Sequence, residues 1–136
     1  IFANNGIYIE PTFVEGIVDE NNFTIKNSYY HPQQRKVYSE DTSKTISIML
    51  ENVVNNGLGK SAKPIKTSAA GKTGTAQTGR EDDNGNELMN AWFVGYFPVT
   101  KPQYTIAVLL DDGTHSSEDA CKIFAKTVNT INLLLQ

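Results

Sequence analysis

Residues 69–77 read Ala-Ala-Gly-Lys-Thr-Gly-Thr-Ala-Gln, and the predicted fold is built around this stretch. Its threonines favour extended backbone, while its glycines and alanines leave that backbone unusually bare. Gly71 and Gly74 are expected to let a ligand approach the main chain closely. Lys72 adds a positive charge, and the threonines add hydroxyl groups that form hydrogen bonds. We interpret the stretch as a strand at the edge of a sheet that can hold an anionic, peptide-like ligand.

Two apolar runs follow this stretch and predict the rest of its sheet. Residues 91–98 read Ala-Trp-Phe-Val-Gly-Tyr-Phe-Pro, and residues 104–110 read Tyr-Thr-Ile-Ala-Val-Leu-Leu. Because nearly every position in the two runs is apolar, we expect both strands to be central and covered on two faces. The polar residues 78–86 are typical of a mobile hairpin loop, and the short connections favour an antiparallel meander.

Two segments have the periodicity of amphipathic helices. Ser39 is a predicted N-cap, and apolar residues then recur at helical spacing until Asn55-Asn56-Gly57 supplies a stop. Ser116 or Ser117 is expected to cap the last helix, which should lie on the sheet. The apolar stripe of this last helix consists of Ala120, Ile123, Phe124, Val128, Ile131, Leu134 and Leu135.

The first third of the chain predicts extended structure and loops. Residues 7–18 have the composition of a strand, and Phe23-Thr24-Ile25 can return as the second strand of an N-terminal hairpin. Residues 27–36 are polar and aromatic and indicate a loop, in which His31 has a loop role. Residues 1–6 read as the last turn of a helix closed by Asn-Gly, so we expect the chain to be cut from something longer.

These elements together predict an α+β fold class. We expect an antiparallel β-meander of three main strands with a packed C-terminal helix, an N-terminal hairpin and one amphipathic helix. The length of 136 residues fits one domain or a large piece of one. A formal net charge of -3 argues against non-specific binding to nucleic acid or acidic membranes. Cys121 is the single cysteine and is interpreted as a small core residue, and the sequence implies no metal and no cofactor.

Phosphate binding is the first chemistry that the central stretch suggests. Gly71-Lys72-Thr73 matches the end of a P-loop, but that motif needs a glycine five residues earlier, where this chain has Lys66. A P-loop also opens a helix, whereas a polar, glycine-containing segment follows here. We therefore do not predict a nucleotide site.

A second interpretation starts from Lys72-Thr73-Gly74, which is the Lys-Thr-Gly element of serine β-lactamases and penicillin-binding proteins. On this element, and on the strands that follow it, the chain resembles the C-terminal part of a penicillin-binding protein transpeptidase domain of the high-molecular-weight class B kind. The resemblance covers nearly the whole chain. It implies that the chain has part of the fold shared by serine β-lactamases and penicillin-binding proteins. It also implies that residues 1–136 are the C-terminal segment of a transpeptidase domain and lack the part that carries the nucleophile.

The resemblance implies that the complete enzyme cross-links peptidoglycan stem peptides through a serine acyl-enzyme. Lys72 and Thr75 are the implied catalytic residues: Lys72 supplies positive charge, and the backbone N–H of Thr75 forms half of the oxyanion hole. The implied substrate-binding residues are Thr73, Gly74, Thr75 and Gln77.

Two further motifs of that family are absent from this sequence. No lysine has a serine or threonine three residues before it, and no Ser-x-Asn or Tyr-x-Asn triplet occurs. We expect both motifs in a missing N-terminal part of the same domain, so that this fragment is inactive alone. The other implied partners are the D-Ala-D-Ala stem peptide, β-lactam antibiotics and proteins of a cell-wall synthesis complex. The implied location is the extracytoplasmic face of a bacterial membrane, with the anchor outside this chain.

Two alternatives remain open at this point. A serine β-lactamase-like hydrolase shares the Lys-Thr-Gly element. A non-catalytic domain that binds peptides or scaffolds a complex would explain the absent serine without any missing part.

Overall fold

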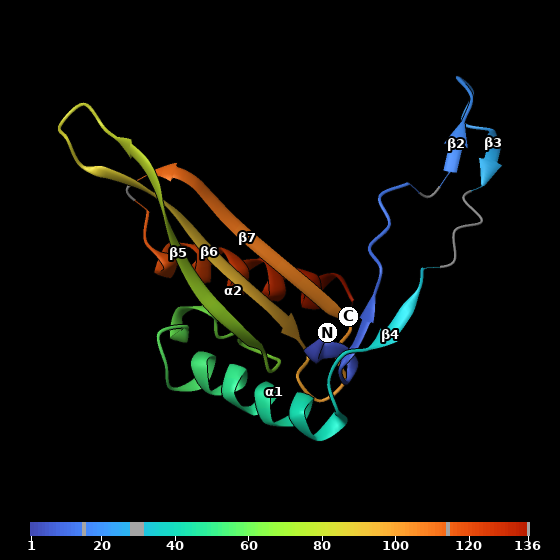
Figure 1. Ribbon diagram of the computed structural model, residues 1–136, viewed down its shortest axis with the longest axis horizontal. Helices are drawn as coiled ribbons and strands as arrows, with labels where there is room; N and C mark the ends of the chain where they lie inside the picture. Colours follow the sequence, from blue (N-terminus) through green and yellow to red (C-terminus); the bar gives the residue numbers. More distant parts are fainter. Residues whose placement is uncertain (15, 28–31, 114, 136) are drawn as a thin grey trace.

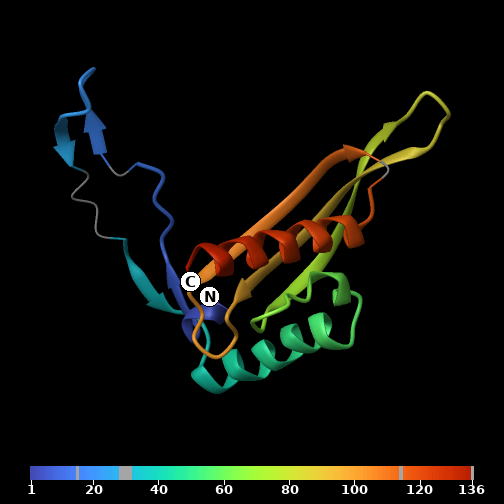
Figure 2. The same ribbon diagram turned by 180° about the vertical axis from the view of Figure 1, so that it is seen from behind.

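The computed structural model describes residues 1–14, 16–27, 32–113 and 115–135, and its centre is an antiparallel sheet in the order β5-β6-β7. The strands are β5 (Ala70–Glu81), β6 (Glu87–Phe97) and β7 (Tyr104–Gly113). The α2 helix (Ser117–Leu134) lies behind this sheet in Figure 1 and in front of it in Figure 2. The expected α+β class, the meander and the packed C-terminal helix are confirmed.

The pairing register decides which side chains share a face of the sheet. Gly71 pairs with Gly95, Thr73 with Phe93 and Thr75 with Ala91. Side chains alternate between the two faces along a strand, so these residues lie on the same side as Phe93. The ring of Phe93 meets the ring of Phe124 on α2 at 4.7 Å between centroids. This face is therefore the one that α2 covers.

Both helices begin at the serine caps that the sequence indicates. The α1 helix (Glu40–Asn55) begins after Ser39, whose hydroxyl accepts a hydrogen bond from the backbone N–H of Thr42 at 3.1 Å. At the start of α2, the Asp119 carboxylate accepts from the backbone N–H of Ser116 at 3.1 Å and from its hydroxyl at 3.0 Å. These bonds satisfy groups that a helix end leaves unpaired.

The hydrophobic core lies on the α2 side of the sheet and reaches the C-terminal end of α1. Cys121 is fully buried there, as expected, and this burial raises the pKa of its thiol to about 11. No described helix is long and apolar enough to cross a membrane. The buried core consists of Val54, Ala62, Ala69, Phe93, Phe97, Val108, Ala120, Cys121, Phe124 and Val128.

The first third of the chain forms two short ladders rather than one hairpin. The strands β2 (Gly16–Val18) and β3 (Thr24–Asn27) pair with each other, which confirms a hairpin. The strand β1 (Ile7–Ile9) pairs instead with β4 (Gln34–Lys36). The prediction of a loop over residues 27–36 is therefore wrong for its last three residues, which form a strand. A polar segment can form a strand here because backbone pairing and the packing of Arg35 over the Tyr8 ring, 5.3 Å from its centroid, hold it.

The β2–β3 hairpin stands away from the rest of the molecule in both views (Figures 1 and 2). Phe13 before it and Phe23 at its turn are largely exposed. The helical turn expected at the chain start is confirmed as η1 (Phe2–Asn4), followed by Asn5 in the left-handed conformation at φ 51°. His31, expected in a loop, lies outside the described residues.

Two expectations about the sheet are wrong. Residues 78–81 continue β5 instead of forming a loop, because the ladder resumes with Glu81 opposite Glu87 after a register shift. The strands β6 and β7 are not both central and covered on two faces. Within the described residues β7 is an edge strand, and on the face away from α2 Val94 is 44% exposed and Leu109 is 42% exposed. Apolar composition predicts burial, but it does not say which part of a protein provides the cover.

We expect Phe124→Ala to lower the free energy of unfolding by about 3–5 kcal/mol, because it opens a cavity under Phe93. Denaturant titration of the protein measures this change. The matched control is Leu134→Ala in the same helix, where the side chain is 80% exposed. The control should change stability by less than about 0.5 kcal/mol. Equal effects of the two substitutions would contradict the packing described here.

Candidate functional site

The candidate site is the first half of β5, which is an edge strand. Its sequence neighbour β6 pairs with one side, and among the described residues no strand pairs with the other. Lys72, Thr75 and Gln77 are exposed, and Thr73 and Gly74 are half-buried. The stretch is thus an accessible strand, which excludes the helix that a P-loop requires.

The Lys72 ammonium group turns toward its own strand. Its Nζ donates to the carbonyl oxygen of Thr73 at 2.8 Å and lies 3.5 Å from the Thr73 hydroxyl. An ammonium group has three donors, so it can bind a further acceptor while it keeps these contacts. The side chain is exposed, and no described carboxylate pairs with it. A positive charge is therefore held beside the strand and available to an anion.

The predicted site residues divide between the two faces of the strand. Thr73, Thr75 and Gln77 share the side on which Phe93 meets α2, whereas Lys72 and Gly74 point to the opposite side. Only the edge of β5 is common to all five residues. A ligand that contacts all of them must therefore lie along this edge, as a peptide does when it adds to a sheet as an extra strand.

The two glycines of the stretch have different roles. A Cβ atom at Gly71 would lie 2.5 Å from Cζ of Phe93 and 2.7 Å from the carbonyl oxygen of Val94. Gly71 is buried and makes room for the core, so the expectation that it lets a ligand approach is wrong. At Gly74 the nearest atom to an added Cβ would be Cβ of Trp92 at 3.3 Å. Gly74 thus remains the position where the backbone is open to a ligand.

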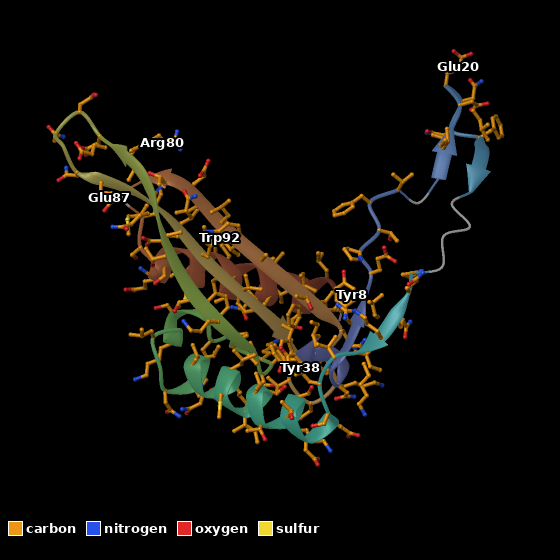
Figure 3. The ribbon with its side chains drawn as sticks, in the orientation of Figure 1. Tyr8, Glu20, Tyr38, Arg80, Glu87 and Trp92 are labelled. Carbon is orange, nitrogen blue, oxygen red and sulfur yellow. The ribbon has the colours of Figure 1, made fainter. Side chains whose placement is uncertain are left out.

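Gln77 is engaged by the neighbouring strand. Its side-chain amide donates to the Glu87 carboxylate at 2.8 Å, and the strand continues past it to Glu81. In Figure 3, Glu87 and Arg80 are labelled toward the far end of the β5–β6 hairpin, and Trp92 is labelled over the sheet. The side-chain carbonyl oxygen of Gln77 remains able to accept a hydrogen bond from a ligand.

The turn between β5 and β6 is held by Asp82. Its carboxylate accepts hydrogen bonds from the backbone N–H of Asn84 at 2.9 Å and of Asn86 at 2.8 Å, and from the Asn86 amide at 2.9 Å. These bonds, those from Asn86 first, lower the pKa of Asp82. Their contribution to stability is present above the unfolded-state pKa and is lost as the pH falls through the folded-state value. The hairpin that extends the site strand is therefore braced at neutral pH.

The face of the sheet away from α2 is called here the open face, and it is turned toward the viewer in Figure 1. Trp92 and Lys72 lie on it, together with the exposed Val94 and Leu109. Tyr96 belongs to the same face and is buried. Sequence reasoning treated Tyr96 only as part of an apolar run. The alternation of side chains along that run places it on the face of Lys72, two residues beyond Val94.

Metal ligands are not gathered anywhere in the part of the chain that the structure describes. No group of three or more His, Cys, Asp or Glu side chains there could hold a metal ion. The chemistry available over residues 72–77 is that of one ammonium group, two threonine hydroxyl groups, the Gln77 side-chain amide and backbone amides.

Comparison with known proteins relates this geometry to a family. The family model described as "Penicillin binding protein transpeptidase domain" matches residues 1–131. A peptidoglycan D,D-transpeptidase FtsI homolog of Mesostigma viride is 31% identical over 81% of this chain and 20% of its own length. Penicillin-binding protein 1F of Bacillus subtilis is 38% identical over 71% of this chain and 13% of its own length. The chain thus spans a fifth or less of these relatives.

A solved structure shares the fold. The D,D-transpeptidase domain of a peptidoglycan glycosyltransferase from Eggerthella lenta superposes with a TM-score of 0.72 at 25% identity, over 98% of this chain and 30% of that one. The matches include both class A and class B proteins, so the similarity extends beyond the class B proteins that the sequence resembles.

We expect Gly71→Ala to lower the free energy of unfolding by about 1–3 kcal/mol, because the new methyl group overlaps Phe93 and the backbone of β6. Gly74→Ala is the matched control in the same strand and should cost less than about 1 kcal/mol, since only Trp92 has to yield. Denaturant titration of the two variants compares them. If Gly74→Ala lowered the free energy of unfolding more than Gly71→Ala does, that result would contradict the roles assigned to the two glycines.

Proposed function

The chain belongs to the family of penicillin-binding protein transpeptidase domains, and on that premise we propose that it is the C-terminal segment of a peptidoglycan D,D-transpeptidase. The segment supplies one wall of the active site, and the nucleophilic serine lies in a part of the protein outside this chain. Two observations support this division. The sequence contains no Ser-x-x-Lys motif, and the relatives that it matches are several times longer.

The observation that carries the proposal is the exposed Lys-Thr-Gly-Thr strand at the edge of the sheet. A stem peptide ending in D-Ala-D-Ala is extended and carries a terminal carboxylate. Its backbone can pair with the edge of β5, which Gly74 leaves clear of a side chain. The hydroxyl groups of Thr73 and Thr75 bind the carboxylate, and Gln77 binds the peptide further along the strand.

The reaction proceeds in two steps. The serine hydroxyl attacks the carbonyl carbon of the D-Ala-D-Ala bond, and the terminal D-alanine leaves with a proton on its amine, which gives an acyl-enzyme ester. An amine of a second stem peptide then attacks the ester, so that the cross-link forms and the serine regains its proton. β-Lactams present the same carbonyl and carboxylate and acylate the same serine.

Lys72 and Thr75 carry the catalytic part of this segment. The Lys72 charge attracts the substrate carboxylate and lies beside the place of the nucleophile. The backbone N–H of Thr75 is one donor of the oxyanion hole, a contribution of about 3 kcal/mol in such sites. The Lys72 contact with the Thr73 carbonyl orients the ammonium group before the substrate arrives, which lowers the cost of binding.

The open face is the surface on which we expect the rest of the protein to contact this segment. Val94, which pairs with Lys72, and Leu109 on β7 are partly exposed there, and an extended apolar surface is normally covered. We assign the cover to the part of the transpeptidase domain outside this chain. In the complete protein the site faces the extracytoplasmic side of the bacterial membrane, where the stem peptides and the proteins of cell-wall synthesis are found.

We expect Lys72→Ala in the full-length protein to slow acylation by labelled penicillin by about tenfold or more, since the ammonium charge is lost. Stopped-flow measurement of covalent labelling gives the rate. Lys126→Ala, in the middle of α2, is the control for a lost surface charge and should leave the rate unchanged. An unchanged rate for Lys72→Ala would remove Lys72 from the site.

The 136-residue chain by itself should form no covalent adduct with labelled penicillin, because it contains no Ser-x-x-Lys nucleophile. Denaturing gel electrophoresis and mass spectrometry detect an adduct, with the full-length protein as the positive control. Stoichiometric labelling of the chain alone would contradict the division of the site. Fast hydrolysis of β-lactams by the full-length protein would instead identify a β-lactamase. If penicillin does not label the full-length protein at all, that result would identify a non-catalytic peptide-binding module.

A further inference from the structure

Three Asn-Gly pairs occur in this chain, at residues 5–6, 56–57 and 84–85. In such a pair the backbone nitrogen of the glycine can attack the side-chain amide carbon of the asparagine, and the missing glycine side chain leaves room for the attack. Asparagine is for this reason one of the residues that change covalently in an otherwise stable protein. Since the three pairs share the same chemistry, we expect the fold to decide which of them reacts.

The fold closes the pair at residues 5–6. Gly6 is buried, and its backbone N–H donates to the carbonyl oxygen of Ile1 at 3.0 Å. Its carbonyl oxygen accepts from the backbone N–H of Val37 at 2.8 Å and of Tyr38 at 3.2 Å. Ring closure has to rotate the peptide unit between Asn5 and Gly6, and this rotation would break hydrogen bonds in the interior.

The pair at residues 56–57 is held by the end of α1. The backbone N–H of Gly57 donates to the carbonyl oxygens of Asn52 at 3.0 Å and of Val53 at 3.1 Å. The side-chain amide of Asn56, which is the group that would leave, donates to the side-chain oxygen of Asn52 at 2.7 Å. The attack would therefore have to undo the last turn of the helix.

The pair at residues 84–85 lies in the turn at the far end of the β5–β6 hairpin, which stands clear of both helices (Figures 1 and 2). Asn84 and Gly85 are exposed. A Cβ atom added at Gly85 would have an oxygen of the Glu81 carboxylate as its nearest neighbour, at 4.0 Å. The backbone N–H of Gly85 donates to the carbonyl oxygen of Asp82 at 3.0 Å, across an exposed turn. Of the three pairs, this one has the most room for ring closure.

We propose that Asn84 is the site at which this protein spontaneously forms a succinimide, and that the product releases the turn held by Asp82. The nitrogen of Gly85 bonds to Cγ of Asn84, the bond from Cγ to the side-chain nitrogen breaks, and ammonia leaves with the proton of the Gly85 amide. Water then opens the ring at either of its two carbonyl groups, which leaves aspartate or isoaspartate at position 84.

Isoaspartate changes this turn more than aspartate does. Oδ1 of Asp82 accepts from the backbone N–H of Asn84 at 2.9 Å and from that of Asn86 at 2.8 Å. In isoaspartate the main chain runs through the former side chain, so one extra carbon separates these two donors and a single oxygen no longer receives both. Either product also adds a negative charge beside Asp82 and Asp83. The brace of the hairpin that extends the site strand is thereby lost.

The test incubates the full-length protein at neutral pH in water enriched in ¹⁸O, which enters the product when the ring opens. Mass spectrometry of proteolytic peptides gives the rate of conversion at each of the three pairs. Asn84 should convert at least about tenfold faster than Asn5 or Asn56, because the other two pairs react only after local unfolding. Similar rates at the three pairs, or a faster rate at Asn5 or Asn56, would overturn the proposal.

The denatured protein is the control for sequence effects. In denaturant the three rates should agree within about threefold, since little structure then separates the pairs. If the folded and the denatured protein showed the same spread of rates, the sequence rather than the fold would set the ranking, and the inference would be wrong.

Hydrogen exchange tests the effect on the turn. In the fraction that carries isoaspartate, the peptide spanning residues 81–87 should exchange its backbone amides about tenfold faster than in the unmodified protein. Asn84→Asp adds the same charge without the extra carbon and should stay within about threefold of the unmodified protein. Unchanged exchange in the isoaspartate fraction would contradict the release of the turn. Neither measurement depends on penicillin, so this inference and the proposed function can fail separately.

Discussion

The contact between Phe93 on β6 and Phe124 on α2 is the constraint on which the rest of the structure depends. The two rings meet at 4.7 Å and 59°, and they attach the C-terminal helix to one face of the sheet. Gly71 and Gly95 lie beside Phe93 and have no side chains that would displace it. Because strand residues alternate, filling this face with Phe93 sends Lys72 to the other one. The direction of the Lys72 side chain therefore follows from core packing on the opposite side.

This core on the α2 side explains why the site combines strong order with exposed surface. The strand that carries Lys72 is anchored through β6 and cannot shift its register without moving Gly71 away from Phe93. Its outer edge is left unpaired among the described residues, and Val94, the partner of Lys72 on the open face, is partly exposed. A rigid strand with an unpaired edge suits the binding of an extended peptide.

Local chemistry allowed much of the fold to be predicted. Ser39 and Ser116 cap their helices where expected, and the run after residue 103 forms a strand because short apolar segments between turns have few alternatives. Apart from residues 78–81, which continue a strand into its own hairpin, the predictions that failed concern contacts between distant segments. Nothing local distinguishes the polar strand Gln34–Lys36 from a loop, because only its pairing with Ile7–Ile9 makes it a strand. The local sequence does not show that Gly71 is closed to a ligand, because the ring of Phe93 that fills the space beside it belongs to a residue more than twenty positions away.

The sequence by itself determined the elements, their caps and the chemistry of the candidate site, since propensity, capping and side-chain alternation act over a few neighbouring residues. It also determined that Lys72 and Gly74 point to the same side of their strand, because the period of a strand is two. Only the tertiary structure decided which side that is, which of the two glycines is open to a ligand, and that Tyr96 on the face of Lys72 is buried. These properties depend on where α2 and β6 lie relative to β5, and contacts between distant segments are set by how the whole chain packs.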